Sequence, residues 1–233
     1  MSKIDEYVGR ILTQTDRAEL DKILALKNEL ASQNKVLSLR DYSLRRAPSS
    51  DHTMEDICNR MGLTSKVGVD IFNIVRSIKP QMCLELGTGI GISGSYIAAA
   101  LKLNNNNGKL ITIEADTILA NLSRDVFYSL DLDNVKVVNA HFINALPTIM
   151  QISDNIDLAF CDGNDNEQRT FEYYQFILNG MRDGAAYILG DIEHSTVWEK
   201  ICNRREVSEY KDMNRIGVCL IGRWKSRGRI GID

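Results

Sequence analysis

The sequence predicts an α/β protein with a mostly parallel, seven-stranded sheet, an antiparallel last strand and an N-terminal helical extension. Two observations support this fold class. After Pro80, short apolar runs alternate with amphipathic segments, which is typical of β-α units around a parallel sheet covered on both faces. Near the C-terminus, residues 206–222 contain strand, turn and strand without room for a crossover helix, so this pair is expected to be antiparallel.

The N-terminal part is predicted to be a helical extension followed by a linker. Between residues 4 and 30, apolar side chains recur at helical spacing among charged ones, which indicates helix in two pieces. The stretch 38–51 loses this period and contains the first proline of the chain, so we interpret it as a linker or lid. The expected units are therefore the extension and linker, 1–51, and one main domain, 52–233.

The main domain is expected to begin with two helices and to continue as five β-α units. The predicted strands are Met82–Leu86, Leu110–Glu114, Val135–Asn139, Ile156–Cys161 and Ala185–Leu189, followed by the antiparallel pair Glu206–Tyr210 and Ile216–Gly222. The predicted helices are Met54–Met61, Thr64–Ile78, Ile92–Leu101, Thr117–Leu130, Leu146–Met150, Glu167–Asn179 and Thr196–Cys202.

Composition limits the classes of partner. Lys plus Arg number 28 against 31 for Asp plus Glu, a net charge of −3, which argues against nucleic acid as the main partner. The longest apolar run falls far short of the ~20 residues that a membrane-spanning helix needs, and the charged N-terminus does not resemble a signal peptide. We therefore expect a cytoplasmic protein with no membrane partner. The 5 cysteines form no C-x-x-C pair, so neither a zinc knuckle nor a disulfide framework is indicated.

The strongest local signal is the run Leu84 to Gly91 (LELGTGIG), in which an apolar strand gives way to a helix. Glycines at such a turn let the backbone bend sharply and approach a ligand closely. Two readings compete. The glycines from Gly89 onward also match the G-x-G-x-x-G dinucleotide fingerprint, which places a pyrophosphate over a helix N-terminus. However, Glu85 ends the strand two residues before Gly87, and a carboxylate there favours a cationic ligand over phosphate.

The pattern Glu85-x-Gly87-x-Gly89-x-Gly91 resembles the first motif of class I S-adenosylmethionine (SAM) dependent methyltransferases, which have a Rossmann-like fold. The resemblance extends over about 64–222 and implies SAM as the cofactor. Glu114 lies 23 residues beyond Gly91, where this family and the dinucleotide-binding proteins both place the acid that binds ribose hydroxyls. The cofactor-binding residues that this resemblance implies are Glu85, Gly87, Thr88, Gly89, Gly91, Ser93, Glu114, Ala115, His141 and Asp162.

The segments IDLAFCDGND and AAYILGDIEHS resemble the small-molecule O-methyltransferase branch related to the catechol and caffeoyl-CoA enzymes. That branch holds a divalent metal with two aspartates and an asparagine. Asp162 and Asp191 match the aspartates, but Ile192 stands where the asparagine belongs. A Mg²⁺ or Ca²⁺ site on Asp162 and Asp191 would therefore need Glu193, His194 or waters as further ligands.

Catalysis in such a protein requires positioning and a base. The carboxyl ends of the first, fourth and fifth strands meet at the crevice where open α/β sheets bind ligands. His194, Asp191 and Asp162 are the candidate catalytic residues there, and His194 needs the least pKa tuning to act near neutral pH. Two plainer roles stay open: His194 could be solvated beside a helix capped by Ser195, and Asp162 could belong to a turn.

The functional expectation is methyl transfer from SAM to an oxygen of a small-molecule acceptor. An NAD(P)-dependent oxidoreductase and a noncatalytic cofactor-binding or assembly protein are the alternatives. The apolar stripe of the N-terminal helices must be buried on the main domain or on a second copy, which makes a homodimer an additional expectation.

Overall fold

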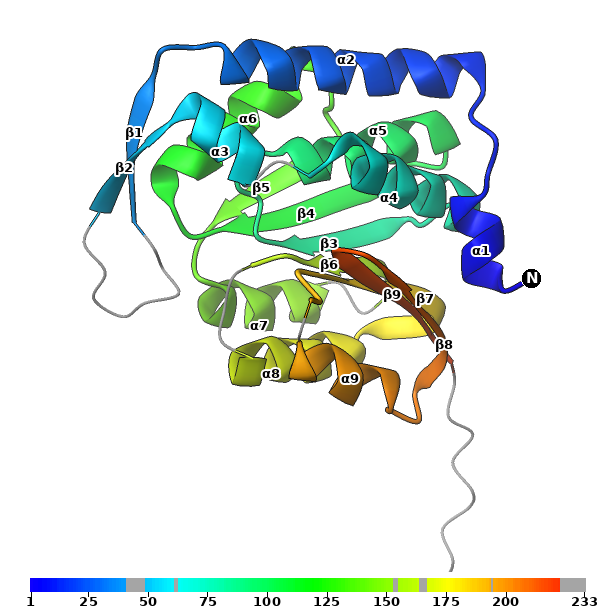
Figure 1. Ribbon diagram of the computed structural model, residues 1–233. Coiled ribbons are helices and arrows are strands. Elements are labelled where there is room, and N and C mark those ends of the chain that lie inside the picture. Colours follow the sequence, from blue (N-terminus) through cyan, green and yellow to red (C-terminus); the bar gives the residue numbers. More distant parts are fainter. Residues whose placement is uncertain (41–48, 61–62, 153–154, 164–166, 194, 223–233) are drawn as a thin grey trace, which may run out of the picture.

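The computed structural model describes residues 1–40, 49–60, 63–152, 155–163, 167–193 and 195–222. Its centre is a seven-stranded sheet of order β5-β4-β3-β6-β7-β9-β8 in which β9 is antiparallel to both of its neighbours (Figure 1). This confirms the predicted mostly parallel sheet with an antiparallel last strand. The strands are β3 (Met82–Leu86), β4 (Lys109–Glu114), β5 (Val135–Asn139), β6 (Ile156–Cys161), β7 (Met181–Gly190), β8 (Val207–Met213) and β9 (Ile216–Ile221).

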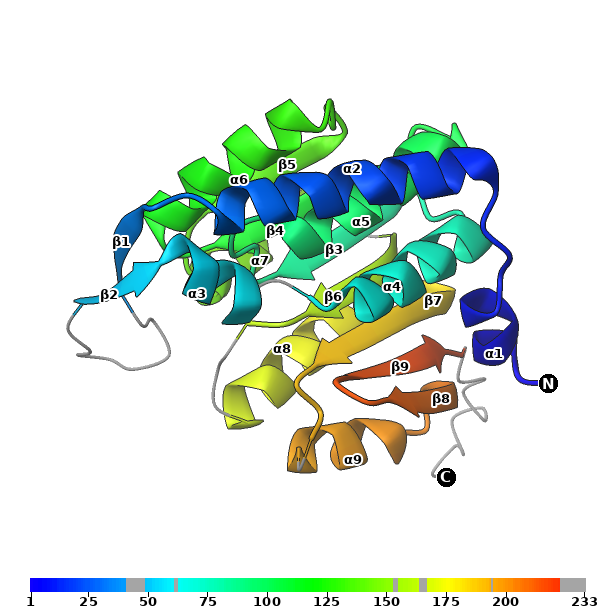
Figure 2. The ribbon, with the colours of Figure 1, turned by 45° about the horizontal axis from the view of Figure 1, so that its top comes forward.

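Helices cover both faces of the sheet, and a further layer lies over one of them (Figures 1 and 2). The helices are α1 (Lys3–Val8), α2 (Gln14–Ala31), α3 (Met54–Arg60), α4 (Ser65–Ile78), α5 (Ile92–Asn104), α6 (Thr117–Ser129), α7 (Phe142–Ile152), α8 (Glu167–Leu178) and α9 (Thr196–Cys202). α4, α5 and α6 lie on one face and α7, α8 and α9 on the other, so the buried apolar side chains form two core clusters.

Capping residues define where several helices begin. Ser2 and Thr13 each form a capping box with the acidic residue three positions later. The Asp116 carboxylate accepts hydrogen bonds from the first amides of α6, and the Ser195 hydroxyl accepts one from Trp198. The predicted cap at Ser195 is therefore confirmed.

The N-terminal helix α2 lies across α3 and α5 as an outer layer (Figure 1). Its apolar side chains Leu20, Ile23 and Leu30 are buried in the same core as α4 and α5. Asp16 at its start is fully buried and pairs with Arg10 and Arg76. The apolar stripe is thus buried within the chain and does not require a second copy. The homodimer stays a prediction.

The predicted linker at 38–51 is wrong in part, because the described residues on either side of 41–48 form an antiparallel strand pair. β1 (Val36–Arg40) and β2 (Ser49–Thr53) pair from Val36 with Thr53 to Arg40 with Ser49. Leu37 and Leu39 are buried while their neighbours are exposed, so the alternation typical of a strand was present in the sequence. The Arg40 amide donates to the Asp116 carboxylate at 3.4 Å, which places the pair at the carboxyl end of β4.

Two other predicted bounds are corrected. The helix expected at Leu146–Met150 spans Phe142–Ile152 and contains Pro147. The strand expected at Ala185–Leu189 begins at Met181. Among the residues that the structure describes, no helix is long and apolar enough to cross a membrane.

Candidate active site

The loop between β3 and α5 has the backbone conformation that its glycines permit. Gly87, Gly89 and Gly91 have φ angles of 94°, 52° and 88°, a region that side chains disfavour. A Cβ atom at Gly87 would lie 2.9 Å from the amide nitrogen of Gly163, and one at Gly91 would lie 3.1 Å from Cβ of Ser123. Both the turn and its close packing therefore require glycine.

Glu114 joins the end of β4 to this loop. Its Oε2 accepts a hydrogen bond from the Gly89 amide at 2.9 Å, and its Oε1 accepts one from the Asp116 amide at 2.9 Å. Burial raises the pKa of this carboxyl, while the amide hydrogen bonds oppose that shift. The side chain remains partly exposed, so each oxygen keeps lone pairs for the hydroxyl groups of a ribose.

Glu85 lies beneath the loop, shielded from solvent. It is 0% exposed, and its carboxylate accepts hydrogen bonds of 2.6 Å from the hydroxyls of Ser93 and Thr112. Burial raises its pKa to about 7. From the sequence we expected this carboxylate to favour a cationic ligand directly. In the structure it connects β3, β4 and the start of α5 from below.

The other predicted cofactor residues surround the same loop. The hydroxyl of Thr88 is buried and lies 2.6 Å from that of Thr112, which extends the network around Glu85. Ala115 follows Glu114 and is partly exposed. His141 is exposed directly before α7, where its backbone carbonyl accepts from the amides of Asn144 and Ala145. The structure thus brings the predicted set to one edge of the sheet.

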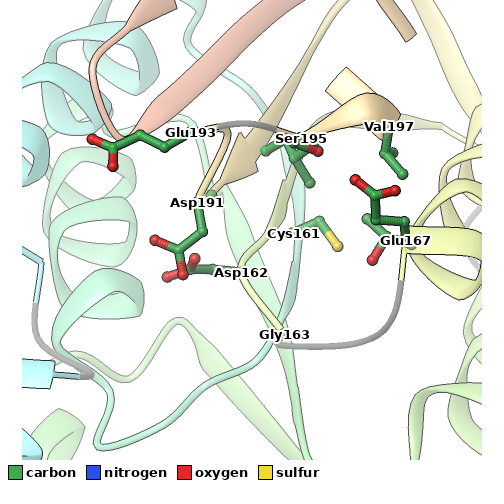
Figure 3. Close-up of a pocket in the computed structure, with 11 residues that line it drawn as sticks. Cys161, Asp162, Gly163, Glu167, Asp191, Glu193, Ser195 and Val197 are labelled. Carbon is green, nitrogen blue, oxygen red and sulfur yellow. The ribbon is translucent and has the colours of Figure 1, made fainter. Parts of the chain in front are cut away.

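A pocket of about 180 Å³ opens beyond the carboxyl ends of β6 and β7. In Figure 3 the carboxylates of Asp162 and Asp191 are turned toward one another on one side, and Glu167, Ser195 and Val197 form the other. The lining residues are Cys161, Asp162, Gly163, Glu167, Thr170, Leu189, Gly190, Asp191, Glu193, Ser195 and Val197.

Sheet register explains how Asp162 reaches this pocket. Cys161 of β6 pairs with Leu189 of β7, so Asp162 and Gly190 are the next residues on parallel neighbours. A Cβ atom at Gly190 would lie 1.8 Å from Oδ1 of Asp162, so the missing side chain makes room for the carboxylate. Burial, and secondarily the charge of Asp191, raises the pKa of Asp162 to about 7, and Arg215 opposes this.

Asp191 is held by Arg215, a residue that the sequence reasoning missed. Gly190 pairs with Ile216 across antiparallel strands, which sets Asp191 and Arg215 opposite one another just past the pair. Nη2 of Arg215 donates to Oδ1 of Asp191 at 2.8 Å. Asp191 itself has a φ of 48°, in the left-handed region. The sequence contains no signal for this contact, because it depends on the register of β7 and β9.

The predicted metal ligands do not fit a divalent cation. Mg²⁺ and Ca²⁺ need about six or more oxygen ligands, and the described part of the chain contains no group of three or more His, Cys, Asp or Glu side chains suited to a metal. Asp162 and Asp191 are only two carboxylates, and one is already paired with Arg215. Ile192 offers an apolar, buried side chain at the third position. His194 lies outside the described residues.

Comparison with known proteins shows what the central segment resembles. Residues 84–192 match the profile of a family described as "Methyltransferase domain", a segment that contains the glycine loop, Glu114 and Asp162. A search of the curated proteins found no significant match. Residues 84–192 are therefore similar to a methyltransferase domain, and the seven-stranded sheet has the fold of the solved methyltransferase structures described next.

Solved structures with the same fold include three bacterial methyltransferases. An O-methyltransferase from Bacillus cereus, in complex with SAH (S-adenosylhomocysteine), is 17% identical with a TM-score of 0.63 and covers 95% of this chain and 98% of its own. The O-methyltransferase TomG from Streptomyces achromogenes, involved in tomaymycin synthesis and in complex with SAM, is 16% identical with a TM-score of 0.61. The match covers 95% of this chain and 100% of TomG. A methyltransferase from Geobacter sulfurreducens is 15% identical with a TM-score of 0.62, covering 92% and 98%.

Proposed function

We propose that this protein transfers the methyl group of SAM to an oxygen atom of a small-molecule acceptor. One observation carries the proposal: the carboxylate of Asp162 lines a pocket directly beyond β6, the strand next to the one that enters the glycine loop. This arrangement places a proton acceptor beside the site that would hold the methyl donor. The names of the B. cereus and S. achromogenes structures, both O-methyltransferases, support oxygen as the acceptor atom.

The glycine loop and Glu114 would bind the cofactor. The loop approaches the ligand with backbone alone, and Glu114 at the end of β4 offers carboxylate oxygens to the ribose hydroxyls. When bound, SAM supplies an activated methyl group, and the protein mainly has to align the acceptor oxygen, the methyl carbon and the sulfur.

Asp162 would act as the base that removes the hydroxyl proton of the acceptor. Its pKa of about 7 suits a base working near neutral pH, where a positioned base contributes ~10²–10⁴-fold to the rate. Asp191 is paired with Arg215 and is the weaker candidate of the two aspartates. His194, the first choice from the sequence, remains a second candidate base.

Calorimetry with purified protein tests the cofactor half of the proposal. SAM and SAH should each bind, whereas NAD⁺ should give no heat, because residues 84–192 match a methyltransferase domain. An NAD⁺ signal without a SAM signal would favour the oxidoreductase alternative.

A turnover assay tests the transfer itself. The protein is incubated with SAM and a panel of phenols, catechols and aliphatic alcohols, and SAH release and methylated product are measured by mass spectrometry. Matched anilines and alkylamines serve as nitrogen acceptors. Methylation confined to the amines would contradict the proposal, and cofactor binding without any turnover would favour a binding protein.

A further inference from the structure

The ion pair between Arg215 and Asp191 reaches the pocket through Asp191, which is one of the residues that line it. Arg215 follows Asn214, which has a φ of 62° in the turn between β8 and β9. Its Nη2 donates to Oδ1 of Asp191 at 2.8 Å, and its backbone carbonyl accepts from the amide of Ile192 at 3.3 Å. One residue thus holds the segment after β7 through both its side chain and its backbone.

The guanidinium is the positive charge that faces three carboxylates. Asp191 raises the pKa of Arg215, through its hydrogen bond first, and Asp162 and Glu193 add smaller contributions of the same sign. Arg215 in turn lowers the pKa of Asp162. The side chains of Arg215 and Asp191 are 47% and 70% exposed, and a pair this exposed adds little to folding stability. Its main effect is on the charge and position of the carboxylates.

The chemistry of the ligand set is unfavourable for a divalent cation at this place. Asp162 and Asp191 are turned toward one another (Figure 3). The next position in the chain holds the buried Ile192. Arg215 already neutralises Asp191, and a metal ion between the aspartates would lie close to the guanidinium and be repelled by it. Guanidinium also remains charged at every pH at which the protein is folded.

We propose that the guanidinium of Arg215 is the resident cation of the acceptor site, fixing Asp191 beside Asp162 where a divalent metal would otherwise bind. The inference rests on the proposed function, since it concerns the same acceptor. In this scheme Arg215 positions Asp191 and also offers an N–H donor to the acceptor oxygen.

The proposal has a consequence for the class of acceptor. A divalent metal orients an acceptor best through two neighbouring oxygens, whereas a guanidinium N–H can donate to a single oxygen. One hydroxyl is then sufficient. Its O–H bond breaks with the proton passing to Asp162, the oxygen bonds to the methyl carbon, and the C–S bond breaks with its electron pair leaving on the sulfur of SAH.

A titration with Mn²⁺, followed by the electron paramagnetic resonance signal of the free ion, tests the proposal directly. The proteins are wild type, Arg215→Gln, Arg215→Lys, and Arg215→Gln combined with Asp191→Asn. Wild type and Arg215→Lys should bind no Mn²⁺ at 1 mM. Arg215→Gln should bind it at least tenfold more tightly than wild type, and the double variant should lose that gain.

Two results would overturn the inference. One is micromolar Mn²⁺ binding by the wild type that the double variant lacks. The other is a folded Arg215→Gln, as judged by circular dichroism, that binds Mn²⁺ no better than wild type. If Arg215→Gln does not fold, the wild-type and Arg215→Lys titrations still decide, because metal binding by either contradicts a resident guanidinium.

Calorimetry with SAH separates this inference from the proposed function. All four proteins should bind SAH within threefold of each other, because Arg215 and Asp191 lie outside the glycine loop. A wild-type protein that does not bind SAH would refute the proposed function. Normal SAH binding together with metal-dependent turnover, lost in EDTA and seen with catechol but not with phenol, would refute only the role of Arg215.

Discussion

The hydroxyl of Ser93 donates a 2.6 Å hydrogen bond to the carboxylate of Glu85, which is completely buried beneath the glycine loop. Burial is the largest of the influences that raise the pKa of Glu85. This relationship makes the loop sensitive to the protonation of one side chain.

Stability should depend on pH through Glu85. Its pKa is about 7 in the folded protein against 4.5 for an ordinary glutamate side chain in water, so the folded state holds the proton more tightly. This contribution is fully present below pH 4.5 and is lost as pH rises through 7, on the order of 3 kcal/mol in all. The measurement is the free energy of unfolding in urea at pH 5 to 8.5.

Glu85→Gln is the matched variant for that measurement, because an amide cannot ionise. Its stability should decline less than that of the wild type between pH 5 and 8.5. Asp162 also has a raised pKa and contributes a decline of the same sign to both proteins, so the difference between them isolates Glu85. Identical slopes for the two proteins would contradict the assignment.

Glu114→Gln should weaken SAH binding while leaving the fold intact. The carboxylate is the charged acceptor proposed for the ribose hydroxyls, and hydrogen bonds to charged groups contribute ~1.5–3 kcal/mol. We expect the dissociation constant to rise roughly 10- to 100-fold, measured by calorimetry. Glu55→Gln, an exposed change on α3, serves as the control and should bind like the wild type. An unchanged affinity in Glu114→Gln would remove this residue from the cofactor site.

Gly91→Ala should impair both the loop and cofactor binding. The residue has a φ of 88°, and the added Cβ atom would lie 3.1 Å from Cβ of Ser123 and 3.2 Å from the ring of Phe127. Gly184→Ala is a matched control, since Gly184 has a φ of 80° but nothing within 4 Å of the new atom. Both variants share a backbone cost of ~1–2 kcal/mol. Only Gly91→Ala should also lose SAH affinity, as calorimetry would show.

Asp162→Asn should separate binding from transfer. SAH binding should weaken far less than catalysis, because the glycine loop and Glu114 are untouched and Asp162 is only one of the predicted cofactor residues, whereas kcat should fall ~10²–10⁴-fold with the loss of the base. In the wild type, kcat should rise with pH through about 7 as Asp162 loses its proton. The readout is SAH release with an acceptor from the hydroxyl panel. A variant with wild-type kcat would shift the role of base to His194.

Asp16→Asn should destabilise the packing of α2 on the main domain. Asp16 is fully buried and forms ion pairs with Arg10 and Arg76. Burial alone would raise its pKa, but hydrogen bonds from Thr13 and Arg10 lower it to about 2. Breaking a buried pair costs ~3–5 kcal/mol. That stability is present above pH 3.8 and is lost as pH falls through 2. Thermal unfolding at pH 7 measures the effect, and the exposed Asp21→Asn should be neutral.

The sequence by itself determined the sheet, the glycine loop and the acid at Glu114, because each is encoded locally. Apolar runs mark buried strands, and three positive φ angles within five residues need glycine. The alternation of Leu37 and Leu39 was also local, although the neighbouring Arg, Ser and Pro residues obscured it.

Only the tertiary structure decided which charges meet. Asp191 and Arg215 are 24 residues apart, and they face one another because Gly190 pairs with Ile216. Asp162 fits beside Gly190 because Cys161 pairs with Leu189. Glu85 is buried beneath the loop because α5 and β4 close over it. A shift of register by one residue would turn the side chains of a strand to the other face, so these meetings of charge depend on how the strands pair in the folded sheet.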